Sequence, residues 1–168
     1  ENLLNNQVKI VNKEITSKQS LLEEHLTSST FSTVIELALH ANPQSQEFRE
    51  IRQSFISEIQ ENTTQDGQPV FDQFLLVDKD GVIKVSSNSD WQNMVINTSI
   101  FEDLNESKSH ALYGLSPIYE NELILVTAVN YQTQRGSTLG TLVGITEKDN
   151  LQQLIQPLNG LSPFASTY

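Results

Sequence analysis

Hydrophobic residues near the start of the chain recur every three or four positions, the spacing typical of one face of a helix. No glycine or proline occurs in residues 1–42, so nothing there interrupts the helix. The apolar face is narrow at first, as in a coiled-coil seam, and a polar residue, Lys18 or Gln19, interrupts it. It widens in residues 31–41, which we therefore expect to pack on a sheet. The narrow face consists of Leu4, Val8, Val11, Ile15, Leu22 and Leu26.

Two local signals divide the helical half of the chain. The run of Thr and Ser at 27–30 has poor helix propensity and predicts a bend. Asn42 and Pro43 predict the end of one helix and the start of the next, with Asn42 as cap and Pro43 in the first turn. This second helix should run to about Glu61, before a turn at Asp66-Gly67. Its apolar face consists of Phe48, Ile51, Phe55 and Ile59.

The second half of the chain alternates apolar and polar residues, as strands do. Strands at 74–77 and 82–86 should form a hairpin, with Gly81 where the turn needs a positive φ. Ser99 and Glu102 form a capping box that predicts a short helix at 100–106. Three further strands are predicted at 111–118, 123–131 and 139–145, the middle one apolar on both faces and so covered on both sides. Thr146 then caps a last helix with Leu151, Leu154, Ile155 and Leu158 on one face.

Composition narrows the range of functions. The net charge of −11 and the lack of Lys and Arg clusters exclude nucleic acid as a partner and disfavour an anionic membrane surface. The absence of cysteine excludes disulfides, thiolate metal sites and a thiol nucleophile. No apolar run in the sequence reaches the length that spans a bilayer. The chain begins at Glu1 without a methionine, and we expect it to be a piece of a longer protein.

No motif points to catalysis, a metal or a cofactor. Asp78 and Asp80 could act as paired carboxylates, but in a hairpin turn such side chains more often bind backbone N–H groups. No two histidines stand four residues apart, and no G-x-S-x-G motif occurs. Gly140 and Gly144 lie within a predicted strand, where they indicate a bulge or a closely packed helix. We therefore expect a protein that is not an enzyme.

Three stretches resemble one known family. FLLVDKDGVIKVSSNSDWQ is similar to the first hairpin of a Cache domain, the extracytoplasmic PAS-like sensor of bacterial and archaeal receptors. LSPIYENELILVTAVNY and TLGTLVGITEKDNLQQLI resemble its last three strands and exit helix. The resemblance covers residues 74–158. The final GLSPFASTY is similar to the start of a second module, as in double Cache domains.

The resemblance implies an α+β fold, with a PAS-like five-stranded antiparallel sheet flanked by helices. Residues 1–42 would form a long, membrane-proximal signalling helix, residues 43–160 the sensor domain, and residues 161–168 the start of a following segment. The implied function is ligand sensing outside the cytoplasm for a membrane-anchored receptor of the histidine kinase, cyclase or chemoreceptor type. Two other interpretations stay open: a dimerisation module without a small-molecule ligand, and an intracellular PAS domain with haem or flavin.

The same resemblance suggests where a ligand would bind. In PAS-like folds the ligand lies between the sheet and the segment that crosses it, here residues 88–109. The candidate ligand-binding residues are Trp91, Tyr113, Ser116, Tyr119 and Thr146. Trp91 and Tyr113 could instead be core or rim residues. Thr146 stands where amino-acid-binding members carry an acidic residue, so the resemblance does not extend to an amino-acid ligand.

The predicted partners are a small molecule of unknown identity and a second copy of the chain. The narrow apolar face of residues 4–26 is the predicted contact of such a homodimer. In the dimerisation interpretation this face would be the main functional feature of the chain.

Overall fold

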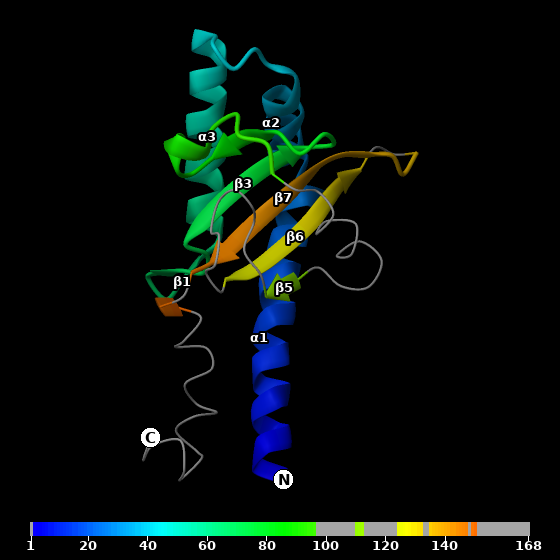
Figure 1. Cartoon of the computed structure of the whole chain (residues 1–168), viewed down its shortest axis with the longest axis vertical. Coiled ribbons are helices and arrows are strands. Elements are labelled where there is room, and N and C mark those ends of the chain that lie inside the picture. The colour runs from blue at the N-terminus through cyan, green and yellow to red at the C-terminus, as the bar shows by residue number, and fades with distance from the viewer. Residues whose placement is uncertain (1, 97–109, 113–123, 133–134, 148, 151–168) are drawn as a thin grey trace.

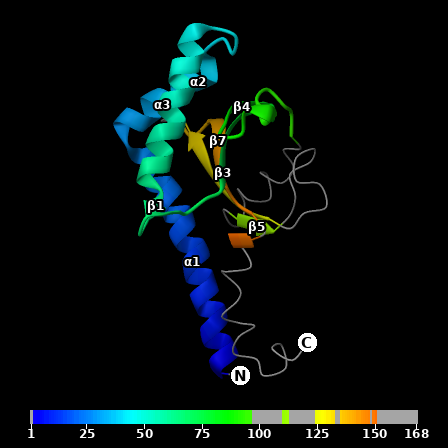
Figure 2. The same cartoon turned by 90° about the vertical axis from the view of Figure 1, so that its left-hand side faces the viewer.

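The structure is a computed structural model that describes residues 2–96, 110–112, 124–132, 135–147 and 149–150. It has two layers, with three helices on one side of a five-stranded antiparallel sheet (Figures 1 and 2). The predicted α+β class and the five-stranded sheet are both confirmed. The first helix runs past the edge of the sheet, so its N-terminal part projects from the body of the domain (Figure 1).

The helical layer consists of α1 (Asn2–Thr27), α2 (Ser29–His40) and α3 (Gln46–Asn62). The predicted bend is confirmed, because Ser28 between α1 and α2 has an extended backbone with ψ of 125°. The prediction that Asn42 caps the next helix is wrong. The Asn42 side chain accepts a hydrogen bond from the Gln44 N–H (3.0 Å), which makes a local turn, and the cap is Ser45, whose Oγ accepts from the Phe48 N–H (3.0 Å).

The main sheet has the strand order β4-β3-β7-β6-β5, and every neighbouring pair is antiparallel. The predicted hairpin is present as the first two of these strands, and β7 lies at the centre. The strands are β3 (Gln73–Asp78), β4 (Ile83–Ser86), β5 (His110–Leu112), β6 (Leu125–Gln132) and β7 (Thr138–Thr146).

A second, two-stranded hairpin precedes the sheet. It pairs β1 (Thr64–Gln65) with β2 (Gln68–Pro69) across the predicted turn at Asp66-Gly67. Both turn residues have positive φ angles, 53° and 76°, as a tight two-residue hairpin turn requires. The turn is confirmed, but two-residue strands are too short to leave a pattern in the sequence.

Alternate residues along the strands form two cores, one on each face of the sheet. On the helix side, Phe31 of α2 and Phe55 of α3 meet with their ring centroids 5.2 Å apart. The first half of β6, residues 125–128, is buried on both faces, as predicted, whereas its second half is partly buried or exposed. The helix-side core includes Leu22, Phe31, Ile35, Phe48, Phe55, Ile59, Phe71, Phe74, Leu76 and Leu142.

The buried part of α1 contains a lysine. Lys18 is only 9% exposed, and its Nζ donates a hydrogen bond to the Val70 carbonyl at 2.6 Å. The same ammonium lies 5.0 Å from the centroid of the Phe71 ring. Burial lowers the pKa of Lys18 below its usual 10.5, and the carboxylates of Glu14 and Asp72 oppose that shift.

Several predicted elements lie outside the described residues. These are the short helix at 100–106, the later part of the strand predicted at 111–118, and the last helix beyond Asn150. The side chains of Leu4, Val8, Val11 and Leu26 on the narrow face also lie outside the description, whereas Ile15 is half-buried. Among the described residues, no helix combines the length and the apolar character needed to cross a bilayer.

We expect Phe55→Ala to lower the free energy of unfolding by about 3–5 kcal/mol, because it leaves a cavity beside Phe31. Denaturant unfolding measures the change. Leu37→Ala is the control, since Leu37 is 48% exposed, and it should cost no more than about 0.5 kcal/mol. Equal losses in the two variants would contradict the observed helix-side core.

Lys18 should also leave a signature in the pH dependence of stability. Because its pKa is lower in the folded chain, folding releases protons just below pH 10.5, and stability gains as the pH rises through this range. Relative to Lys18→Met, the unfolding free energy of wild type should therefore increase as the pH rises toward 10.5. Lys13→Met, at an exposed lysine of the same helix, is the matched control. If the unfolding free energy of wild type relative to Lys18→Met instead falls as the pH rises, the pKa of Lys18 is not lowered by folding.

Candidate functional site

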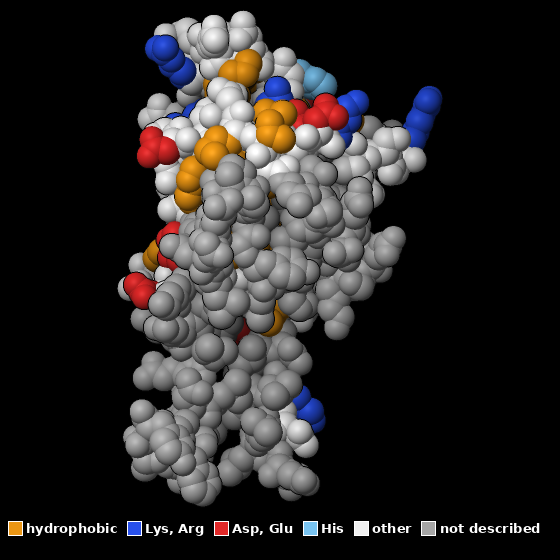
Figure 3. All heavy atoms as spheres, in the orientation of Figure 1, with side chains coloured by type: hydrophobic (Ala, Val, Ile, Leu, Met, Phe, Trp, Pro, Cys, Tyr) orange, Lys and Arg blue, Asp and Glu red, His pale blue; other side chains and the backbone are white. Residues whose placement is uncertain are grey.

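The face of the sheet that points away from the helices has an apolar floor. Its side chains come from alternate positions of β3, β6 and β7, and nearly all are fully buried. In the space-filling view of this side, hydrophobic side chains gather around β4 and the segment that follows it (Figure 3). The floor consists of Leu75, Val77, Val126, Ala128, Val143 and Ile145.

The segment after β4 folds back along that strand and forms one wall of this face. A short 3-10 helix, η1 (Ser89–Trp91), begins it, with the Asn88 side chain accepting from the Asp90 N–H. The chain then pairs with Ile83, whose N–H donates to the Met94 carbonyl (2.8 Å) and whose carbonyl accepts from the Asn93 N–H (2.9 Å). Trp91, Met94 and Ile96 consequently pack against the floor.

The structure separates two of the predicted site residues. Trp91 is half-buried against the outer core, as a ligand wall or a rim residue would be. Ile145 belongs to the same outer core, so its neighbour Thr146, paired with Leu125, points to the helix side of the sheet. Trp91 and Thr146 therefore do not share a site.

The other three candidates, Tyr113, Ser116 and Tyr119, lie outside the described residues, and their role stays a prediction. Thr146 borders a different, polar pocket of about 480 Å³ at the base of the sheet, together with Glu14, Lys18 and Asn150. Its Oγ1 is buried and has no hydrogen-bond partner among the described residues.

Sequence reasoning missed three polar residues of this region. Asn130 and Thr141 lie side by side on β6 and β7, and the Thr141 hydroxyl donates to the Asn130 side chain at 2.9 Å. Gln92 follows Trp91, and its amide donates to the Lys84 carbonyl. The Gln92 Oε1 is buried without a partner in the described part of the chain. Asn130 continues the two-residue alternation of Val126 and Ala128, so the pattern could have placed it on this face.

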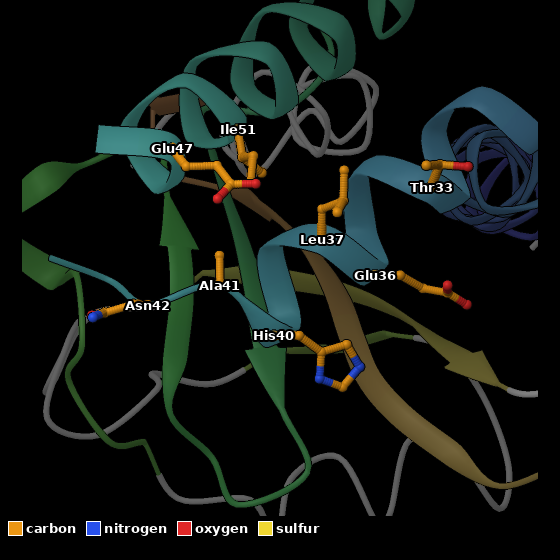
Figure 4. Close-up of a pocket in the computed structure, with 8 residues that line it drawn as sticks. All are labelled: Thr33, Glu36, Leu37, His40, Ala41, Asn42, Glu47 and Ile51. Carbon is orange, nitrogen blue, oxygen red and sulfur yellow. The ribbon is translucent and has the colours of Figure 1, made fainter. Parts of the chain in front are cut away.

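A second hollow of about 490 Å³ lies in the helical layer, between the end of α2 and the start of α3. Leu37, Ile51 and Glu47 point into it, whereas His40 points away (Figure 4). The Glu36 carboxylate beside it already accepts a hydrogen bond from the Tyr131 hydroxyl (2.8 Å). The hollow is open and contains none of the residues predicted for ligand binding, so the sheet face remains the better candidate.

The turn carboxylates serve the fold. One oxygen of Asp78 accepts the N–H groups of both Asp80 and Val82, each at 2.9 Å, and Gly81 has a φ of 87°. Asp80 is exposed. Within the described ranges, no cluster of three or more His, Asp or Glu residues could hold a metal ion. The interpretation of Asp78 as a turn residue is therefore confirmed.

Several solved structures are similar to this chain. The E. coli DcuS sensor domain matches with a TM-score of 0.54 and 11% identity, over 90% of this chain and 98% of that chain. An extracellular ligand binding receptor from Desulfohalobium retbaense DSM5692 matches with a TM-score of 0.47 and 13% identity, over 88% of this chain and 26% of that chain. The GABA-bound ligand binding domain of the Pseudomonas aeruginosa PAO1 amino acid chemoreceptor PctC matches with a TM-score of 0.40 and 17% identity, over 96% of this chain and 70% of that chain.

No protein-family model and no curated protein matches the chain. The likeness to the DcuS domain extends over nearly the full length of both chains, and it shows the fold. The chain therefore shares the fold of that domain, which agrees with the α+β fold that the sequence resemblance implied.

Replacing Asp78 tests its role in the turn. Asp78→Ala removes the acceptor of two backbone N–H groups and should lower the free energy of unfolding by about 1–3 kcal/mol. Asp80→Ala removes an equal charge from the same turn and should change it by less than about 0.5 kcal/mol. Chemical denaturation measures both, and an equal loss in the two variants would mean that charge, not hydrogen bonding, matters here.

Proposed function

We propose that this chain is the extracytoplasmic ligand-sensing domain of a membrane-anchored signalling receptor. The observation that carries the proposal is the fold, a five-stranded antiparallel sheet with a projecting N-terminal helix, which resembles the DcuS sensor domain over nearly its whole length. The receptor would be of the histidine kinase, cyclase or chemoreceptor type, and the chain itself would carry no catalytic activity.

The proposed ligand site is the outer face of the sheet, beside Trp91. The apolar floor would hold the body of a small molecule, and the Asn130–Thr141 pair and Gln92 would supply hydrogen-bonding groups at its edges. This lining favours a small organic molecule with a compact apolar part and one or two polar groups. The predicted Tyr113, Ser116 and Tyr119 would complete the site from the segment between β5 and β6.

Ligand binding would signal by changing how the sheet packs on α1. A ligand shifts a conformational equilibrium only to the extent that it binds the two states with different affinity. The proposed ligand face and α1 lie on opposite sides of the sheet, so the central strands would have to transmit the conformational change that the ligand causes (Figure 2). The projecting part of α1 would then carry the change toward the membrane.

A thermal-shift screen tests the proposal. Small carboxylates, amines, nucleobases and sugars are added separately, and one class should raise the melting temperature by about 5 °C at 100 times its Kd. The same compound should change the fluorescence of Trp91, the only tryptophan of the chain.

A blocking variant shows where the compound binds. Ala128→Leu places a larger side chain on the outer face. It should weaken the apparent affinity for the compound at least tenfold and so reduce the thermal shift that the compound produces. Gln132→Leu, at an exposed position of the same strand, should leave it unchanged. If no class of compound has an effect and the chain sediments as a dimer, the dimerisation interpretation is favoured instead.

A further inference from the structure

Residues 70–72, which we call the strap, lie between α1 and the C-terminal end of β7. The strap follows the β1–β2 hairpin, and the Val70 N–H donates to the Thr63 carbonyl (3.0 Å) at the end of α3. On the other side, the Val70 carbonyl accepts the hydrogen bond from the buried Lys18 ammonium of α1 (2.6 Å). One residue of the strap is thus bonded to both helices.

The middle residue of the strap, Phe71, fits over a glycine of β7. A Cβ atom at Gly144 would lie 2.5 Å from the Phe71 ring, closer than such atoms approach in proteins. The ring is almost fully buried, meets Phe74 edge-on with the ring centroids 5.5 Å apart, and has the Lys18 ammonium 5.0 Å from its centroid. The Phe71 ring therefore lies close both to Gly144 of the sheet and to Lys18 of α1.

The last residue of the strap, Asp72, holds the end of β7. Its N–H donates to the Ile145 carbonyl at 2.8 Å, and one carboxylate oxygen accepts the Glu147 N–H at 2.6 Å. The other oxygen accepts from the Asn150 side chain, so the same carboxylate also binds the residues that follow β7. The strand end and the strap must therefore move together.

The strap contacts the part of β7 that also reaches the proposed ligand face. Val143 and Ile145 point to the outer core, whereas Gly144 between them faces Phe71. A displacement of this strand by a ligand would therefore reach Phe71 through Gly144 and Asp72 through the Ile145 carbonyl. Within the strap, Phe71 and Val70 are the residues that contact Lys18 on α1.

We propose that the strap is the coupling element that carries a displacement of β7 to α1, with Gly144, Phe71 and Lys18 as positioning residues. This inference rests on the proposed function, because a coupling between β7 and α1 is useful only if the domain is a sensor. The contacts that define it belong to the protein without ligand, so it can be tested without one.

The first test removes the link to α1. Lys18→Met keeps an unbranched side chain but removes the donor to Val70, and amide hydrogen exchange in residues 14–22 should become roughly tenfold faster. Exchange in α2 and α3 should stay within about twofold of wild type. Lys13→Met, exposed on the same helix, should change neither region. Equal acceleration in all three helices, or none in α1, would overturn the proposal.

The second test perturbs β7 and measures the response in α1. Gly144→Ala forces the Phe71 ring to move, so exchange in residues 14–22 should rise by a similar factor. Gly140→Ala is the matched control in the same strand. Its Cβ would meet the Val77 carbonyl oxygen of β3 at 2.9 Å and Leu39 of α2 at 3.1 Å, so it should disturb the β3–β7 pairing and α2 more than α1. Phe71→Leu, which removes the ring, gives the same readout if Gly144→Ala does not fold. A response of α1 no larger than that of α2 would refute the coupling.

The two proposals can fail separately. If Lys18→Met and Gly144→Ala loosen α1 but no compound stabilises the chain, the strap couples β7 to α1 and the sensor function is wrong. If a compound binds but neither substitution changes amide hydrogen exchange in α1, the chain is a sensor in which residues other than the strap carry the signal.

Discussion

The burial of β7 on both faces is the constraint on which the rest of the structure depends. β7 pairs with β3 from Gln73↔Ile145 to Asp78↔Gly140 and with β6 along its other edge. Its alternate side chains supply both cores, and two of its helix-side positions are glycines that let Leu39 and Phe71 approach the backbone. Helices on one side and the candidate site on the other therefore share a single strand, and neither can be repacked alone.

Local signals predicted the parts of the fold that local interactions determine. The β3–β4 hairpin followed from Gly81 and its flanking apolar residues, and the break at Ser28 followed from poor helix propensity. The start of α3 did not follow, because the Asn42 side chain makes a turn of its own and leaves the cap to Ser45. Two residues with similar capping ability stand close together here, and composition alone does not distinguish them.

Long-range contacts determine what the sequence could not predict. Lys18 interrupts the apolar pattern of α1, yet it is buried because Val70 and Phe71, more than fifty residues later, provide an acceptor and a ring. Trp91 packs against the outer core, and its predicted role in ligand binding stays a prediction. The face of Thr146 depends on the register of β7, where a change of one residue reverses the side chain. Asn130 and Thr141 become neighbours only through the pairing of two strands.

The N-terminal part of α1 projects beyond the sheet, so a small tilt of the helix would become a larger displacement at that end (Figure 1). About 16 residues of this helix precede its attachment at Lys18, a length of about 24 Å at about 1.5 Å per residue. A tilt of about 5° at that attachment would move the N-terminal end of α1 by about 2 Å, while the side chains around Lys18 would shift by only tenths of an ångström. A packed core can accommodate shifts of that size. The position of Lys18 along α1 therefore determines how far the N-terminal end of the helix would move for a given tilt.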